Sequence, residues 1–137
     1  ALDFALNLAE KYSAEIRLLS VVPPIIVPPY VYPSFGATPV PSAPSEFQTY
    51  SDKLKARFEK VLHSALEKAH KINPDLKIST KLEEGRVAEK IIKTAKEENI
   101  DMIVMGSRGL SGIKELFLGS ISDTVADKAI CPVLIVK

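Results

Sequence analysis

The sequence predicts an α/β protein built on a parallel β-sheet. Segments with helical spacing alternate with short apolar segments along nearly the whole chain, an order that favours a parallel sheet with helices on both faces. Two of the apolar segments, 101–105 and 132–136, are almost continuously hydrophobic, as expected of strands buried on both faces. The length of 137 residues suits one domain, here taken as residues 1–137.

The first elements follow from apolar spacing. Residues 2–12 predict a helix. Its expected inward face comprises Leu2, Ala5, Leu8, Ala9 and Tyr12, with Phe4 beside it. Residues 15–22 form a short apolar run that Pro23 and Pro24 end, which indicates a strand.

Pro23 to Ser45 holds eight of the ten prolines and three aromatic residues. Proline fixes φ and lacks an N–H, so this segment is neither regular helix nor central strand. We expect an extended loop insertion, and its aromatics leave room for contact with a protein partner.

A long amphipathic helix follows the loop, with Ser45 as the expected N-cap and Gln48 at the capping-box position. Its expected inward residues are Phe47, Tyr50, Leu54, Phe58, Val61, Leu62, Ala65, Ala69 and Ile72. The segment from Asn73 to Asp75 ends it.

The second half repeats the strand–helix alternation. Residues 76–82 alternate apolar and polar side chains, which fits an edge strand, and Gly85 makes the following turn. A helix over 86–99 precedes the strand 101–105. A further helix over 120–129, with Ile121, Val125, Ala126 and Ala129 inward, precedes the last strand, Pro132 to Val136.

The bulk composition excludes several functional classes. The net charge of +1, from 18 basic and 17 acidic residues, gives no sign of nucleic-acid binding. No apolar run approaches membrane-spanning length. The single cysteine, Cys131, excludes an internal disulfide framework and fits a cytoplasmic protein. His63 and His70 lie amid charges without a partner cluster, so we expect no metal site and no catalytic histidine.

A glycine-rich segment from Met105 to Ser120 carries the main functional signal. It holds four of the six glycines, at positions 106, 109, 112 and 119. It begins at the carboxyl end of a buried strand, where open α/β sheets bind ligands. It ends at a helix N-terminus, where unpaired N–H groups and partial positive charge favour phosphate.

The alternative interpretation is that these glycines only permit turns in the backbone and bind no ligand. The Ser120 hydroxyl could donate to a phosphate or cap its own helix. Arg108 supplies several donors within the segment, and Lys114 is a second possible charge. The spacing matches neither G-x-x-x-x-G-K-[ST] nor G-x-G-x-x-G, which excludes a common P-loop and a dinucleotide fingerprint.

The run Gly106-x2-Gly109-x9-Gly119-Ser120 resembles the G-2x-G-9x-G-[ST] signature of the ATP-binding branch of the universal stress protein family. The flanking "DMIVMGSRG" and "CPVLIVK" resemble that family as well. The resemblance implies a Rossmann-like, HUP-type, three-layer α/β/α fold with a five-stranded parallel sheet in the order 3-2-1-4-5. It implies a homodimer that binds ATP, with or without Mg²⁺. The residues it places against the nucleotide are Val21, Val22, Met105, Gly106, Arg108, Gly109, Gly119, Ser120 and Ile121.

The chain departs from the family at its start, because the family begins with a strand whose final Asp contacts the nucleotide. This sequence opens in the helix that follows that strand. A sheet without its central strand would leave ladder groups unpaired, at about 1–3 kcal/mol for each buried group. We therefore expect that the given sequence lacks a short N-terminal piece, the alternatives being a truncated protein or a strand donated by another chain.

The last strand, Pro132 to Val136, is apolar although the implied sheet order places it at an edge. Exposed apolar edges invite pairing, so we expect a homodimer through this strand. The leading functional hypothesis is an ATP-binding regulatory module with at most slow hydrolysis. The alternatives are a nucleotide-independent dimer that binds a partner through the Pro-rich loop, and an adenylate-forming or nucleotidyl-transfer enzyme.

Overall fold

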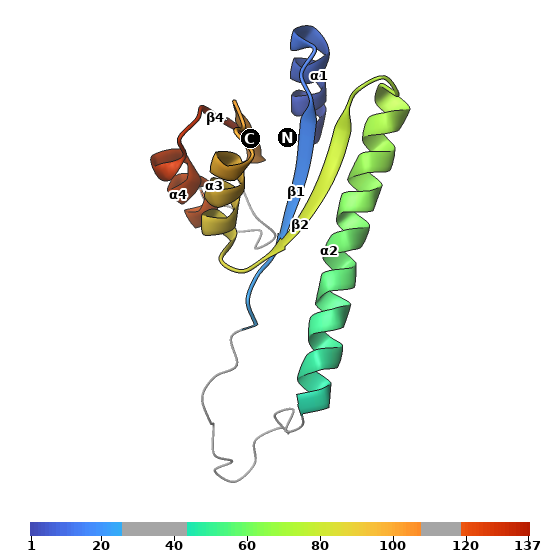
Figure 1. The fold of residues 1–137 in the computed structure, drawn as a ribbon, viewed down its shortest axis with the longest axis vertical. Helices are drawn as coiled ribbons and strands as arrows, with labels where there is room; N and C mark the ends of the chain where they lie inside the picture. Colours follow the sequence, from blue (N-terminus) through green and yellow to red (C-terminus); the bar gives the residue numbers. More distant parts are fainter. Residues whose placement is uncertain (26–43, 108–118) are drawn as a thin grey trace.

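The computed structural model describes residues 1–25, 44–107 and 119–137, with the side chains of 44–46 left undescribed. Figure 1 shows the course of the chain. The described elements are α1 (Leu2–Tyr12), β1 (Ile16–Val22), α2 (Pro44–Ile72), β2 (Ile78–Glu84), α3 (Val87–Glu97), β3 (Ile103–Gly106), α4 (Ser120–Lys128) and β4 (Val133–Val136). This order is the helix–strand alternation that the sequence predicts.

The strands form two parallel pairs. β1 pairs with β2 from Ile16 opposite Ile78 to Val22 opposite Glu84. β3 pairs with β4 from Ile103 opposite Val133 to Gly106 opposite Val136. These are the two outer pairs of the expected order, and within the described ranges no strand joins β1 to β3. The α/β class with parallel strands is therefore confirmed, with two sheets of two strands in place of one continuous sheet.

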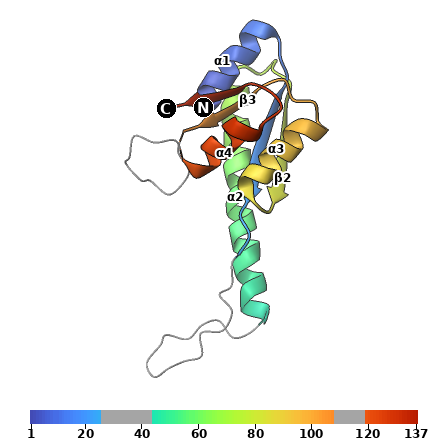
Figure 2. The ribbon, with the colours of Figure 1, turned by 90° about the vertical axis from the view of Figure 1, so that its left-hand side faces the viewer.

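Helices cover both faces of the β1–β2 sheet. Lys55 of α2 pairs with Glu84, whereas Lys90 of α3 pairs with Glu83. Because neighbouring strand residues point to opposite faces, α2 and α3 lie on opposite sides of this sheet. Figures 1 and 2 agree on this arrangement, and they show α4 beside α3 and the two chain ends near each other.

The core is small and lies between helices and strands. Its buried apolar residues are Leu6, Ala9, Val21, Val22, Leu62, Ala69, Ala95 and Val125. The expected inward face of α1 is partly wrong, because Leu6 is buried while Tyr12 is 77% exposed and Phe4 is exposed too. The buried pair Leu6 and Ala9 has the i, i+3 spacing of a narrower stripe than the one expected.

The inward faces of α2 and α4 also need correction. On α2, Leu62 and Ala69 are buried, but Tyr50, Val61 and Ile72 are exposed. These three recur every eleven residues and so follow one line along the helix, beside the face that meets the sheet. On α4, Ala126 is exposed, whereas Ser122 and Val125 are buried.

The start of α2 differs from the expected cap. The helix begins at Pro44, so the expected N-cap residue Ser45 lies within its first turn. Proline suits the first helical turn because its missing N–H would have no intrahelical acceptor there. The Gln48 side-chain amide donates to Asp52 Oδ1 at 3.1 Å.

A chain of charges fastens α3 to the β1–β2 sheet. Glu98 contacts Arg17 at 2.7 Å and Lys81 at 2.9 Å. Lys81 also contacts Glu83 at 3.1 Å, and Glu83 contacts Lys90 at 2.9 Å. The Lys81 ammonium, followed by Arg17, lowers the pKa of Glu98, and Glu98 in turn raises the pKa of Lys81. The polar face of the alternating strand is therefore occupied by a network of ion pairs rather than by water alone.

The variant Glu98→Gln should unfold more readily than the wild type at pH 7. The folded pKa of Glu98 lies below its ordinary value of 4.5, so its charge stabilises the fold above that pH. This stabilisation disappears as the pH falls through the folded pKa. Urea unfolding at pH 7 and at a series of lower pH values measures the effect, and the difference in unfolding free energy between variant and wild type should narrow as the pH falls below 4.5.

Glu97→Gln is the matched control, because Glu97 is the preceding residue and its one ion pair among the described residues is with Lys93, at 3.6 Å and on an exposed surface. Exposed pairs of this kind contribute little to stability. Equal losses of unfolding free energy for the two variants at pH 7, or a loss for Glu98→Gln that does not narrow as the pH falls, would refute the role given to the network.

Candidate functional site

The expected ligand-binding residues fall into two described groups. One group is Val21 and Val22, at the carboxyl end of β1. The other lies around the end of β3 and the start of α4, and comprises Met105, Gly106, Gly119, Ser120 and Ile121. Arg108 and Gly109, with Gly112 and Lys114, lie outside the described residues. No hydrogen bond between the described residues joins the two groups.

Ser107 is the junction that holds the second group together. Its N–H donates to Val136 O at 2.9 Å, which extends the β3–β4 ladder by one residue. Its carbonyl accepts the Gly119 N–H at 3.0 Å and the Ser122 hydroxyl at 3.2 Å. The start of α4 is thereby fixed against the end of β3, and both ends of the glycine-rich segment meet at one carbonyl.

The N-terminus of α4 has the form of an anion site. Gly119 is its N-cap, without a side-chain cap, and the Asp123 N–H donates to Gly119 O at 2.9 Å. The N–H groups of Ser120 and Ile121 precede that first helical bond and have no acceptor among the described residues. Ser120 is thus a helical residue rather than the cap of its own helix. Ser120 is exposed, and its hydroxyl and these N–H groups are donors of the kind that bind an anion at a helix N-terminus.

The backbone of Gly119 does not require glycine. Its φ of −63° and ψ of 148° are values that any residue adopts at an N-cap. Among the described glycines, only Gly85 has a positive φ, at 135°. The turn-forming interpretation therefore applies to Gly85, where the sequence placed a turn, and does not explain Gly119.

The register of β1 distinguishes Val21 from Val22. The Ile16 N–H donates to Lys77 O, and the Gly85 N–H donates to Val22 O, both at 2.9 Å. In a parallel ladder, alternate residues bond to the same neighbour, so Val22 directs its backbone groups at β2. Val21, itself a buried residue, directs its N–H and C=O away from β2.

The same reasoning separates Gly106 from Met105. The Ile103 N–H donates to Pro132 O, and the Ser107 N–H donates to Val136 O. Met105 lies between them in the same phase and therefore pairs with β4. Gly106 directs its backbone groups away from β4, without a side chain to cover them.

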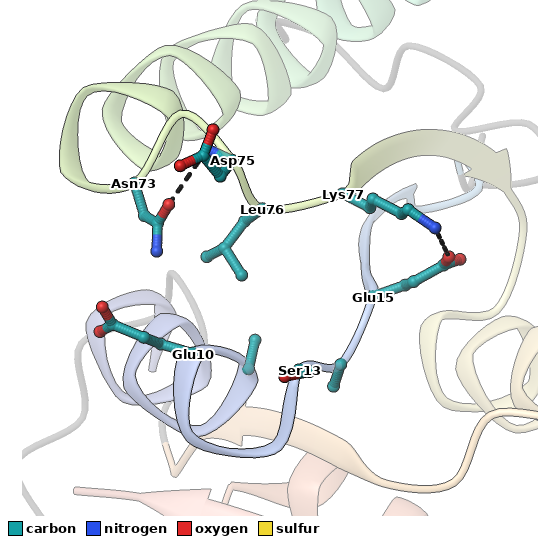
Figure 3. A pocket seen from close by; sticks show the side chains of 9 residues that line it. Glu10, Ser13, Glu15, Asn73, Asp75, Leu76 and Lys77 are labelled. Carbon is teal, nitrogen blue, oxygen red and sulfur yellow. Dashed lines mark hydrogen bonds and ion pairs between the residues drawn. The ribbon is translucent and has the colours of Figure 1, made fainter.

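A shallow cavity of about 260 Å³ lies at the opposite, amino end of β1 and β2. Glu10, Asn73 and Asp75 face it from the end of α1 and from the turn after α2 (Figure 3). The Asp75 N–H donates to Asn73 Oδ1, and Lys77 contacts Glu15 at 3.1 Å on its rim. Its position at the amino ends of parallel strands sets it apart from the region where α/β sheets bind ligands.

The described residues hold no cluster of three His, Cys, Asp or Glu side chains suited to a metal. His63 is exposed and contacts Glu67 at 3.3 Å, as a surface pair. Asp123 lies in the first turn of α4, where its charge suits the helix dipole. None of the helices in the described ranges is long and apolar enough to cross a membrane.

Comparison with known proteins identifies the class. The model of the universal stress protein family matches residues 1–137, and the chain belongs to that family. It is 36% identical to universal stress protein YxiE of Bacillus subtilis over its whole length and 88% of that protein. It is 32% identical to universal stress protein MJ0531 of Methanocaldococcus jannaschii, again over its whole length and 73% of that protein.

Solved structures show the same fold. Universal stress protein UspA from Lactobacillus plantarum superposes with a TM-score of 0.77 at 21% identity, over 98% of this chain and 86% of that one. A universal stress protein family protein from Arabidopsis thaliana with AMP bound superposes with a TM-score of 0.62 at 21% identity, over 100% of this chain and 75% of that one. A universal stress protein in complex with cAMP superposes with a TM-score of 0.61 at 24% identity, over 99% of this chain and 83% of that one.

Gly119→Ser should separate a phosphate site from a simple turn. Serine is a preferred N-cap, so stability should change by no more than about 1 kcal/mol. Its side chain would occupy the space before α4, and its hydroxyl would take N–H groups that an anion needs. We expect ATP affinity to fall at least about tenfold, which corresponds to 1.4 kcal/mol.

Titration calorimetry with ATP and urea unfolding, both on wild type and variant, provide the two measurements. Thr124→Ser is the control on the same helix, since the Thr124 hydroxyl only bonds Ser120 O at 2.7 Å. A Gly119→Ser protein that binds ATP as the wild type does would show that the glycine serves no ligand.

Proposed function

We propose that this protein is an ATP-binding regulatory module in which nucleotide binding is coupled to the state of a homodimer. The observation that carries the proposal is the start of α4, where the N–H groups of Ser120 and Ile121, without an acceptor among the described residues, lie beside the Ser107 junction. Phosphates would bind there, with Gly106 beside them. Val21 would offer its backbone N–H and C=O to the base, a donor–acceptor pair that matches an adenine edge.

The relatives support an adenine nucleotide as the ligand. The Arabidopsis protein was solved with AMP and another family member with cAMP. The choice of ATP rests on the G-2x-G-9x-G-[ST] signature that Gly106, Gly109, Gly119 and Ser120 reproduce. Arg108 would add charge for the outer phosphates.

Hydrolysis should be slow at most. Among the described residues at the Ser107 junction and in the first turn of α4, the one carboxylate is Asp123, which belongs to the helix start. A general base must lie within hydrogen-bond reach of the proton it removes. Mg²⁺ would enter with the nucleotide rather than through a protein site, because the phosphates supply ligands of their own.

Calorimetry with ATP, AMP, cAMP and GTP tests the ligand. ATP should bind with micromolar to millimolar affinity and GTP more weakly, because its base presents a different edge to Val21. Release of ADP should stay below about 1 s⁻¹, the lower range of ordinary enzymes. No binding of ATP at millimolar concentration would favour the nucleotide-independent dimer, and faster turnover would favour an enzyme.

The dimer would form through β4. Pro132 and alternate residues bond to β3, so Val133 and Ile135 direct their backbone groups to the outer edge of β4. The side chains from Val133 to Val136 are only half-buried within the chain. An apolar edge with free ladder groups suits pairing with a second copy. The Pro-rich segment 23–45, the alternative route to a partner, lies mostly outside the described residues.

Ile135→Pro should convert the dimer into a monomer. Proline removes an outward N–H while leaving the bonds between β3 and β4 in place. Light scattering at micromolar concentration measures the mass, and circular dichroism verifies the fold. A wild-type protein that is already a monomer, or a folded Ile135→Pro protein that remains a dimer, would rule out this edge as the interface.

A further inference from the structure

Ser122 is a buried polar residue that the nucleotide proposal does not use. Its residue exposure is 2%, on a helix whose other buried side chain is Val125. Its hydroxyl lies 2.8 Å from Gly119 O and 3.2 Å from Ser107 O. A hydroxyl has one proton to donate, so it is shared between two carbonyls that belong to the two ends of the glycine-rich segment.

Backbone hydrogen bonds accompany the Ser122 contact. The Gly119 N–H donates to Ser107 O, and the Asp123 N–H donates to Gly119 O. Ser122 therefore completes a set of four hydrogen bonds that fixes Gly119 relative to the end of β3. The contact with Ser107 O is buried and the contact with Gly119 O is part-buried, so water competes less for these carbonyls than it would in an exposed turn.

We propose that Ser122 is a positioning residue for the phosphate end of the nucleotide site, a role that rests on the proposed function. It does not touch the ligand. By holding Gly119 against Ser107, it fixes where the N–H groups of Ser120 and Ile121 point and how far they lie from Gly106. Preorganised donors bind an anion more tightly than donors that must first be ordered.

The fold does not need this hydroxyl as an obligatory partner. In Ser122→Ala, Ser107 O keeps the Gly119 N–H and Gly119 O keeps the Asp123 N–H. Neither carbonyl is left without a donor, and alanine favours helix. The variant should therefore fold, with the position of Gly119 less tightly held.

The test compares Ser122→Ala with Thr124→Val. Thr124 lies on the same helix and donates its hydroxyl to Ser120 O at 2.7 Å, but it joins no second element. Titration calorimetry should give an ATP dissociation constant raised about fivefold or more in Ser122→Ala, in line with the loss of one hydrogen bond. Thr124→Val should bind ATP as the wild type does.

Adenosine separates positioning from general loosening. Ser122 acts at the phosphate end, so Ser122→Ala should weaken ATP more than adenosine, whereas partial unfolding would weaken both alike. A second readout needs no ligand: amide hydrogen exchange at Gly119 should speed up about tenfold in Ser122→Ala and stay unchanged in Thr124→Val.

The outcomes separate the two proposals. Absence of ATP binding by the wild type rejects the proposed function, and Gly119 exchange then still decides whether Ser122 fixes that residue. Wild-type ATP affinity in Ser122→Ala, equal losses for ATP and adenosine, or unchanged Gly119 exchange overturns the Ser122 proposal alone. A Ser122→Ala protein that does not fold assigns the hydroxyl to the core and overturns it as well.

Discussion

The hydrogen bonds at Ser107 are the constraint on which the rest of the candidate site depends. One residue ends the β3–β4 ladder through its N–H and receives the start of α4 through its carbonyl. Without that double use, the N-terminus of α4 would have no fixed relation to the strand end. Every helix N-terminus has N–H groups without an intrahelical acceptor. The hydrogen bond to Ser107 is what positions the N-terminus of α4 next to the end of β3, beside Gly106.

The parallel register supplies the second half of the arrangement. Because alternate residues in a parallel strand bond to the same neighbour, Val21 and Gly106 direct their backbone groups away from the paired strand, whereas Val22 and Met105 direct theirs towards it. The two residues lie at the carboxyl ends of strands that belong to different sheets. The ion-pair network around Glu98 acts elsewhere, by fastening α3 to the β1–β2 sheet.

The sequence predicts the order and type of the elements well, because apolar spacing records which face of each element is covered. It predicts the turn at Gly85, which a positive φ confirms. The sequence-based prediction of burial fails where a polar residue is buried or an apolar one is exposed. Hydrophobic spacing predicts Ala126 as an inward residue of α4, but Ala126 is exposed. The same spacing cannot predict that the polar residue Ser122 is buried. Tyr12 shows the converse, an aromatic residue at helical spacing that lies in water.

The candidate site was visible in part. Glycine spacing located Gly119 and Ser120, but it could not tell that Gly119 is the cap and Ser120 the first helical residue, because that depends on the backbone. Which of Val21 and Val22 keeps free backbone groups depends on register, which no local pattern encodes. The most direct test of the account is an amide chemical-shift titration of the isotope-labelled protein with ATP. Saturable shifts should appear together at Val21, Gly106, Ser120 and Ile121, whereas shifts confined to the amino-end cavity around Ser13 and Asn73, or none at all, would contradict it.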